Sequence, residues 1–288
     1  MSAEAEVIGK LRGRLAMSGL RKLDACAEAN RFAFRKAWLG SMGVEHGVTL
    51  LSLIEELCSV LDICVVGRRV EVPTRDGVVA IANHVGIAKL MKVRRLQIEC
   101  SLSADQRRSY PMTGRLLNSD SFLALFAAPI ASLLSVFGDL RLDIIPVSVR
   151  YQGAFGEIAQ SLGFIQISAR EKRAFDFVVS EVSLRAMTAK ASGALPVVIM
   201  FPEAGTSGKR QSGDPFVLEP FRSGFLRLAQ QLDFSILPVV TTFNRRFEVF
   251  AQALAVVQAT DGQTNDLIGQ IRQVMQCQIN RNLAAAAA

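Results

Sequence analysis

The N-terminal part of the chain carries the apolar spacing of helices. Over residues 3–38, apolar positions recur every three or four residues without proline, which predicts an amphipathic helix. A second helix is predicted over residues 47–66, and the acidic residues inside it argue against a membrane-spanning segment there. The chain is therefore expected to begin with a helical region.

After residue 65, short apolar runs alternate with helical stretches. Strands are predicted at residues 69–72, 78–82, 144–149, 164–168, 196–201 and 235–240. Helices are predicted over residues 171–190, 221–232 and 262–283. Strands that alternate with helices are typical of an α/β layer fold.

One segment differs from both patterns. Residues 121–138 (SFLALFAAPIASLLSVFG) hold no charge over 18 positions, a length that just reaches that of a membrane span. Pro129 lies in the middle of the segment and interrupts helical hydrogen bonding. We predict a buried or membrane-dipping helical hairpin here rather than a true span.

Composition narrows the range of partners. Of the 288 residues 50% are hydrophobic, the formal net charge is +7 and the mean hydropathy is +0.28. A basic, apolar chain favours phospholipid headgroups, phosphorylated substrates or acyl carriers. Aromatic residues make up only 7%, and no RNA-binding or zinc-finger pattern is visible, so nucleic acid is expected only within a larger assembly. Five cysteines without CxxC spacing indicate a reducing compartment.

Candidate chemistry lies where predicted strands end. Asn83 and His84 directly follow the strand VVAIA, at a strand-to-loop junction where catalytic groups often lie. Residues 201–209 (FPEAGTSGK) follow another strand, and their glycines, hydroxyl groups and lysine are suited to holding an anion. Arg170 follows the strand GFIQIS and is a ready phosphate ligand. Taken singly, each pattern is equally typical of a solvated loop.

Taken in order, these pieces resemble the glycerol-phosphate and lysophospholipid acyltransferase family. This family includes the 1-acylglycerol-3-phosphate acyltransferases. That family carries Asn-His-x4-Asp after its first strand, an arginine after a later strand, then Phe-Pro-Glu-Gly-Thr and a Val-Pro-Val strand. The counterparts here are Asn83-His84, Arg170, Phe201-Pro202-Glu203 with Gly205-Thr206, and Leu237-Pro238-Val239.

The resemblance implies a fold and a domain plan. The fold is α/β, with a glycerol-phosphate acyltransferase-like mixed sheet flanked by helices and with N-terminal helices before it. The similar stretch covers residues 65–250, so a helical region is expected at residues 1–64 and a C-terminal strand, helix and tail at residues 251–288.

The resemblance also implies a reaction. His84 is the general base that takes a proton from an acceptor hydroxyl, which attacks an acyl thioester on coenzyme A or acyl carrier protein. The acceptor is a lysophospholipid or a glycerol phosphate, and neither a metal nor a bound cofactor is implied. The residues that this resemblance assigns to substrate binding are Asn83, Arg170, Glu203, Gly205, Thr206 and Lys209.

The sequence departs from the family at the acid that should orient the histidine. The fifth residue after His84 is Lys89, which offers only donors and disfavours an imidazolium. Losing the acid of a Ser-His-Asp triad lowers the rate by about 10⁴-fold. Ala204 is also inserted between Glu203 and Gly205.

Two hypotheses follow from this departure. In the first, the chain is an active acyltransferase and another carboxylate reaches His84. The candidate carboxylates are Asp120, Asp139 and Asp143. In the second, the chain is a pseudoenzyme that serves as a structural or lipid-binding subunit of a membrane, mitochondrial or ribonucleoprotein complex. Both hypotheses imply a membrane-associated protein, on the cytoplasmic face of a membrane or in a mitochondrion.

Overall fold

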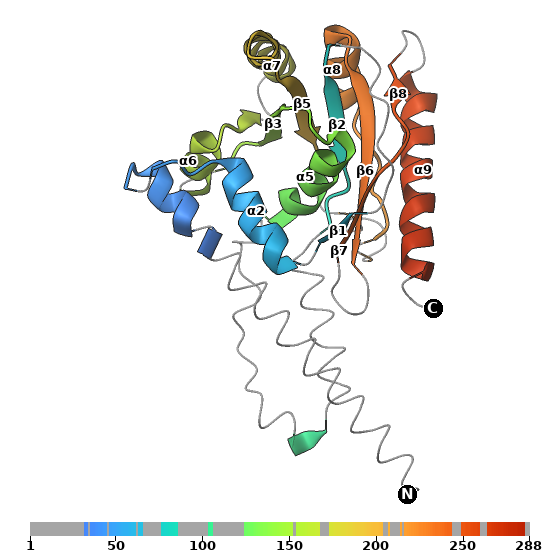
Figure 1. Cartoon of the computed structure of the whole chain (residues 1–288). Coiled ribbons are helices and arrows are strands. Elements are labelled where there is room, and N and C mark those ends of the chain that lie inside the picture. The colour runs from blue at the N-terminus through green and yellow to red at the C-terminus, as the bar shows by residue number, and fades with distance from the viewer. Residues whose placement is uncertain are drawn as a thin grey trace, which may run out of the picture.

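The structure is a computed structural model of the whole chain (Figure 1). The residues it describes are 32–33, 35–44, 46–61, 63–65, 76–85, 103–105, 124–151, 154–167, 173–203, 207, 214, 216–243, 249–259 and 264–285. Most of the predicted helix 3–38 and the predicted strand 69–72 lie outside these residues. The described end of the first helix is helical at residues 35–41.

Within the described residues, eight strands form one mixed sheet in the order β1-β7-β6-β2-β5-β3-β4, with β8 paired to β6. Strands β6, β2, β5, β3 and β4 run parallel, whereas β7 and β8 are antiparallel to β6. The strands are β1 (Ile63–Val65), β2 (Val78–Ala82), β3 (Leu142–Val149), β4 (Ile165–Ile167), β5 (Leu195–Met200), β6 (Ser235–Phe243), β7 (Val249–Ala253) and β8 (Val257–Gln258).

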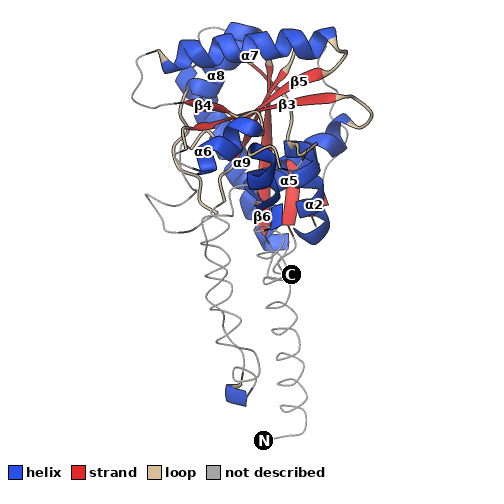
Figure 2. Ribbon diagram, turned by 90° about the vertical axis from the view of Figure 1, so that its left-hand side faces the viewer, coloured by secondary structure: helices blue, strands red, loops and turns tan. Residues whose placement is uncertain are grey.

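Helices cover the sheet, and every residue of β2 is buried. Helix α5 packs against β7, β1 and β6 and is itself covered by α2, whereas α7 and α8 pack against β5, β4, β2 and β6 (Figures 1 and 2). The helices are α2 (Leu50–Leu61), α5 (Ala124–Phe137), α6 (Ala154–Ser161), α7 (Ala174–Ala191), α8 (Gly224–Leu232) and α9 (Thr264–Ala285). The predicted α/β fold with a mixed sheet, flanking helices and helices before it is confirmed.

The predicted strands at 78–82, 144–149, 164–168, 196–201 and 235–240 correspond to β2, β3, β4, β5 and β6. Sequence analysis missed α6, and it expected one strand within residues 251–288 where the structure has β7, which begins at residue 249, and β8. It also extended the helix at 47–66 through β1, because the apolar run continues where the chain turns from helix to strand. β7 pairs with both β6 and β1, so contacts distant in sequence decide its conformation.

The predicted hairpin over residues 121–138 is wrong. Residues 124–137 form a single helix, α5, which contains Pro129. Its side chains from Phe126 to Ile130 are buried between α2 and the sheet, so packing offsets the hydrogen bond that proline removes. Among the described residues, no helix is both long enough and apolar enough to cross a membrane.

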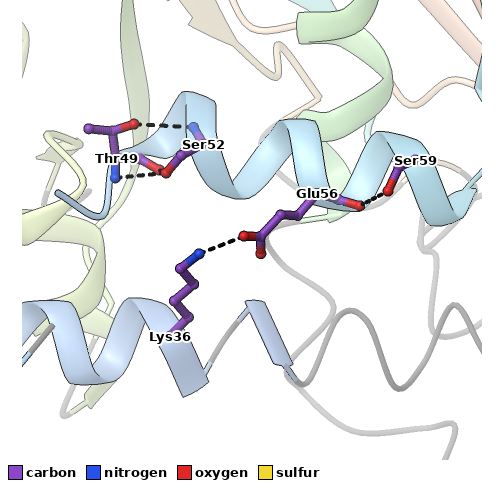
Figure 3. Close-up of polar contacts among 5 residues, drawn as sticks. All are labelled: Lys36, Thr49, Ser52, Glu56 and Ser59. Carbon is purple, nitrogen blue, oxygen red and sulfur yellow. Dashed lines mark hydrogen bonds and ion pairs between the residues drawn. The ribbon is translucent and has the colours of Figure 1, made fainter. Parts of the chain in front are cut away.

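Helix α2 has a defined start and a fixed neighbour (Figure 3). The Thr49 N–H donates to Ser52 Oγ and the Ser52 N–H donates to Thr49 Oγ1, both at 3.1 Å, which forms a reciprocal capping pair. Lys36 Nζ lies 2.5 Å from Glu56 Oε1 and ties residues 35–41 to α2.

The Cys58 thiol of α2 donates to Ala127 O of α5 at 3.7 Å. Burial raises the pKa of this thiol to about 11, so it stays protonated.

Gly77 gives a test of packing at the start of β2. A Cβ at this position would lie 2.6 Å from Cζ of the buried Phe234 ring. We therefore expect Gly77→Ala to lower the free energy of unfolding by about 1–3 kcal/mol, measured by urea denaturation. Gly224→Ala is the matched control, because nothing lies within 4 Å of its added Cβ. Equal effects of the two substitutions would contradict this packing.

Candidate functional site

The candidate site lies at the edge of the sheet where parallel strands end. Ile81 of β2 is paired with Met200 of β5, and Ala82 is paired with Val239 of β6. The residues that follow β2 and β5 therefore leave the sheet side by side. This is the edge at which open α/β sheets bind ligands.

Asn83 joins the ends of β2 and β6. Its Nδ2 donates to Thr241 O at 2.9 Å, and its Oδ1 accepts from the Thr241 N–H at 2.7 Å. The amide thus takes the place of a backbone pair where β2 leaves the sheet. Asn83 is 2% exposed, and its amide oxygen and nitrogen are each bonded to the backbone of β6. Its predicted contact with substrate stays a prediction.

His84 is held by its backbone to the loop that follows β5. Its N–H donates to Glu203 Oε1 at 2.9 Å, and its carbonyl accepts from the Ser207 N–H at 2.9 Å. Ser207 Oγ donates to the same Glu203 oxygen at 2.7 Å. We call Glu203 and Ser207 the histidine clamp. It brings together two motifs that are 119 residues apart in the sequence.

The carboxylate of Glu203 also holds a third segment. Its Oε2 accepts from the Glu219 N–H at 2.8 Å, so both oxygens are bonded to protein donors. Glu203 is 1% exposed, and this burial raises its pKa. The hydrogen bonds that it accepts oppose the rise, and the nearby carboxyl of Glu219 adds to it. The structure therefore gives Glu203 a positioning role, and its predicted contact with an acceptor stays untested.

Helix α9 supports the clamp from behind. Gln276 accepts from the Leu218 N–H at 2.8 Å and donates to Phe216 O at 3.0 Å. Arg272 Nε donates to Glu219 O at 3.1 Å. These bonds fix the segment at residues 216–219, which in turn donates to Glu203. The C-terminal helix is therefore coupled to the position of His84.

The His84 ring lies against a row of aromatic side chains. Its centroid is 5.3 Å from that of Phe201, at the end of β5. Phe201 meets Phe126 of α5 edge to face at 5.1 Å, and Phe126 meets Phe164 at 5.0 Å. The apolar helix α5 therefore provides one wall for the half-buried imidazole.

The topology excludes two of the three carboxylates expected to assist His84. Asp143 pairs with Pro196, and the next pair along β5 places Val197 beside Val78. Asp143 thus lies level with Gly77. Because Gly77 is seven residues before His84, Asp143 is about 23 Å from His84 along the strand direction. Asp139 lies in the turn before β3, at the same far edge. The hypothesis that either residue orients His84 is therefore wrong.

The other predicted site residues lie outside the described part of the chain. They are Lys89, Asp120, Arg170, Gly205, Thr206 and Lys209. Strand β4, which precedes Arg170, ends at the same side of the sheet as β2 but three strand positions away. In the described residues, no group of three or more His, Cys, Asp or Glu side chains is placed to hold a metal ion.

Sequence analysis did not identify the polar residues that support the site. Ser207 and Glu219 are buried but lie in irregular segments without a periodic signal. Arg272 and Gln276 are one helical turn apart on α9, a spacing that places both on one face. The i, i+4 spacing of Arg272 and Gln276 is the sequence signal that could have linked them. Nothing in the sequence shows that this face of α9 is turned toward the segment at residues 216–219.

Comparison with known proteins agrees with the motifs. The model of the Acyltransferase family matches residues 144–242, about a third of the chain, from β3 to β6. This confirms the predicted resemblance to acyltransferases over a stretch that contains Arg170, the Phe-Pro-Glu loop and the Leu-Pro-Val strand. Asn83 and His84 lie outside it. No curated protein sequence matches the chain.

A solved structure shows a weaker likeness. It is 1-acyl-sn-glycerophosphate (LPA) acyltransferase, PlsC, from Thermotoga maritima, which is 14% identical and covers 95% of this chain and 97% of its own. The TM-score is 0.41, too low for this likeness to decide the fold. The fold assignment rests on the strands and helices described above.

Removal of the Glu203 carboxylate tests the clamp. We expect Glu203→Ala to lower the free energy of unfolding by about 2–4 kcal/mol, because three donors at a buried site lose their acceptor. Denaturant unfolding measures the change, and Glu157→Ala on the exposed face of α6 is the control. A loss no larger than that of the control would contradict the structural role of Glu203.

The raised pKa of Glu203 predicts a pH dependence. The folded state binds the Glu203 proton more tightly than the unfolded state, so this residue's contribution to stability falls as pH rises above the ordinary value of 4.5. We expect the free energy of unfolding of the wild type, relative to that of Glu203→Gln, to decrease as the pH rises above that value, measured by urea denaturation over a series of pH values. A difference that rises with pH would contradict this assignment.

Proposed function

We propose that the chain is an acyltransferase-type protein that moves an acyl chain from acyl-CoA or acyl carrier protein to the hydroxyl of a lysophospholipid or glycerol phosphate. The observation that carries the proposal is the clamp, which fixes the His84 backbone at the end of β2 through Glu203 and Ser207. The family match over the Phe-Pro-Glu loop gives independent support.

In the proposed reaction, the His84 imidazole accepts the proton of the acceptor hydroxyl. The hydroxyl oxygen attacks the thioester carbonyl, and the tetrahedral intermediate expels the thiolate, which takes the proton back from the imidazolium. Arg170 and the loop at residues 205–209 are proposed to bind the acceptor phosphate, because arginine and backbone N–H groups suit a phosphate. Glu203 acts through His84 as a positioning residue.

Lys89 sets the expected rate. A lysine at this position cannot accept the imidazole N–H, and its charge opposes the imidazolium that forms during proton transfer. Asp139 and Asp143 cannot replace the missing acid, because they lie at the opposite edge of the sheet. We therefore expect transfer to be slower than in an enzyme with the aspartate, by up to about 10⁴-fold on the scale of a serine-protease triad.

The same observations favour a second candidate. A chain that keeps the clamp but lacks the acid would bind an acylated phosphate lipid without transferring its chain. Such a protein would act as a lipid-binding or structural subunit, at a membrane or in a larger assembly. The basic net charge of +7 suits an anionic lipid in both cases.

A thiol-release assay separates the two candidates. We expect the purified full chain to release free thiol slowly from acyl-CoA with lysophosphatidate, His84→Ala to abolish the release, and Lys89→Asp to raise it by at least about tenfold. His46→Ala is the control, because His46 is exposed in a turn and is not held by the clamp.

Other outcomes point away from acyl transfer. Activity that survives His84→Ala would contradict the role of this histidine. A wild type that shows no acyl transfer but binds lysophosphatidate, while Lys89→Asp gains transfer, would establish the second candidate. If both proteins transfer no acyl chain from acyl-CoA or acyl carrier protein and bind no lipid, both candidate functions are refuted.

A further inference from the structure

Two polar side chains of helix α9 hold an irregular segment of the chain, residues 216–219. The Arg272 guanidinium donates to the carbonyl oxygens of Leu218 and Glu219, with Nε 3.1 Å from the Glu219 oxygen. Gln276 Oε1 accepts from the Leu218 N–H at 2.8 Å. The segment belongs to no helix or strand, so side chains of α9 supply partners that regular structure would otherwise give its backbone.

An apolar stripe fixes the direction in which these two side chains leave α9. The stripe consists of the buried residues Ile268, Ile271, Met275 and Ile279. Figure 1 shows α9 running alongside β6, which it contacts. Arg272 and Gln276 each follow a member of the stripe by one position, so they lie at its border. The helix cannot turn them away from the segment without exposing its apolar stripe to water.

The held segment is bonded in turn to the histidine clamp. The Glu219 N–H donates to Glu203 Oε2 at 2.8 Å, and Glu203 Oε1 accepts from the His84 N–H at 2.9 Å. The two oxygens belong to one planar carboxylate, so a shift of the Glu219 backbone moves the group to which His84 is bonded. Burial of Glu203 strengthens these hydrogen bonds. We call the path from α9 through residues 216–219 and Glu203 to His84 the α9 relay.

We propose that Arg272 and Gln276 are positioning residues for acyl transfer, which act through the α9 relay on the backbone of His84. This inference rests on the proposed function. It gives a role in the reaction to a helix that lies outside the family match at residues 144–242 and holds none of the sequence motifs. Neither side chain contacts the substrate. A displacement of about 1 Å in a reacting group lowers the rate by about 10²-fold, so a small shift of the relay is enough to matter.

The α9 relay predicts a loss confined to kcat. We expect Arg272→Ala and Gln276→Ala each to lower kcat for thiol release from acyl-CoA with lysophosphatidate by about tenfold or more, and to change KM by less than about twofold. Arg272→Lys should lie between the wild type and Arg272→Ala, because an ammonium can still donate to one of the two carbonyls. The variants are compared in the wild type and in the Lys89→Asp chain.

The same helix offers matched controls. Arg281 and Gln273 are exposed on α9, so we expect Arg281→Ala and Gln273→Ala to leave kcat unchanged. The melting temperature of each variant shows that it is folded at the temperature of the assay. A loss of kcat in the controls as large as that in Arg272→Ala would overturn the proposal.

A double-variant cycle separates positioning from a general loss of stability. The Glu203→Gln side chain has a single acceptor oxygen, so it cannot accept from both Glu219 and His84. The relay is then already broken, and we expect Arg272→Ala to lower kcat by less than about threefold in this chain. If Arg272→Ala costs as much there as in the wild type, it does not act through Glu203 and the proposal is overturned.

Hydrogen exchange of the His84 amide tests the relay without acyl transfer. Relative to the amides of β2, we expect Arg272→Ala to speed this exchange by about tenfold or more, measured by NMR, and Arg281→Ala to leave it unchanged. Unchanged exchange in Arg272→Ala would refute the relay whatever the activity. Faster exchange with an unchanged kcat would overturn the positioning role and leave the proposed function standing. If neither the wild type nor Lys89→Asp transfers an acyl chain, the proposed function fails and the positioning role with it, whatever the exchange shows.

Discussion

The carboxylate of Glu203 is the interaction on which the site depends. It is buried, and it accepts hydrogen bonds from the backbone of His84, from the hydroxyl of Ser207 and from the backbone of Glu219. These donors come from the end of β2 and from two separate parts of the connection between β5 and α8. A buried carboxylate is stable only when such donors compensate for its lost hydration, so the three segments and the charge hold one another in place.

The rest of the fold brings these donors together. Pairing of β2 with β5 and β6 puts the ends of three strands at one edge, and the Asn83 amide extends the pairing to Thr241. Helix α9 fixes the segment at residues 216–219 through Arg272 and Gln276. Helix α5, which is uncharged and largely buried beneath α2, carries Phe126 of the aromatic row that ends at His84. The imidazole is thus positioned by contacts from most layers of the protein.

This arrangement separates the position of the histidine from its protonation chemistry. The clamp acts on the backbone of His84, whereas the residue that orients the imidazole in acyltransferases would act on the ring. In the proposed reaction, Lys89 changes the protonation chemistry of the ring without requiring a change in the position of the histidine. A chain of this kind can keep the fold and the placement of the motif while its rate of acyl transfer falls. For this reason the site geometry and the acyl-transfer activity are separate questions.

The sequence by itself determined the α/β class, the strands of the parallel core and the order of the motifs, because local periodicity and strand-end residues carry that information. It did not determine that residues 124–137 form one buried helix, since an uncharged run fits a hairpin, a span or a core element equally well. The tertiary structure alone decided that Asn83 and Glu203 face inward as structural ligands and that Asp143 lies far from His84. Those outcomes depend on strand register and on partners up to 158 residues away, which no local pattern encodes.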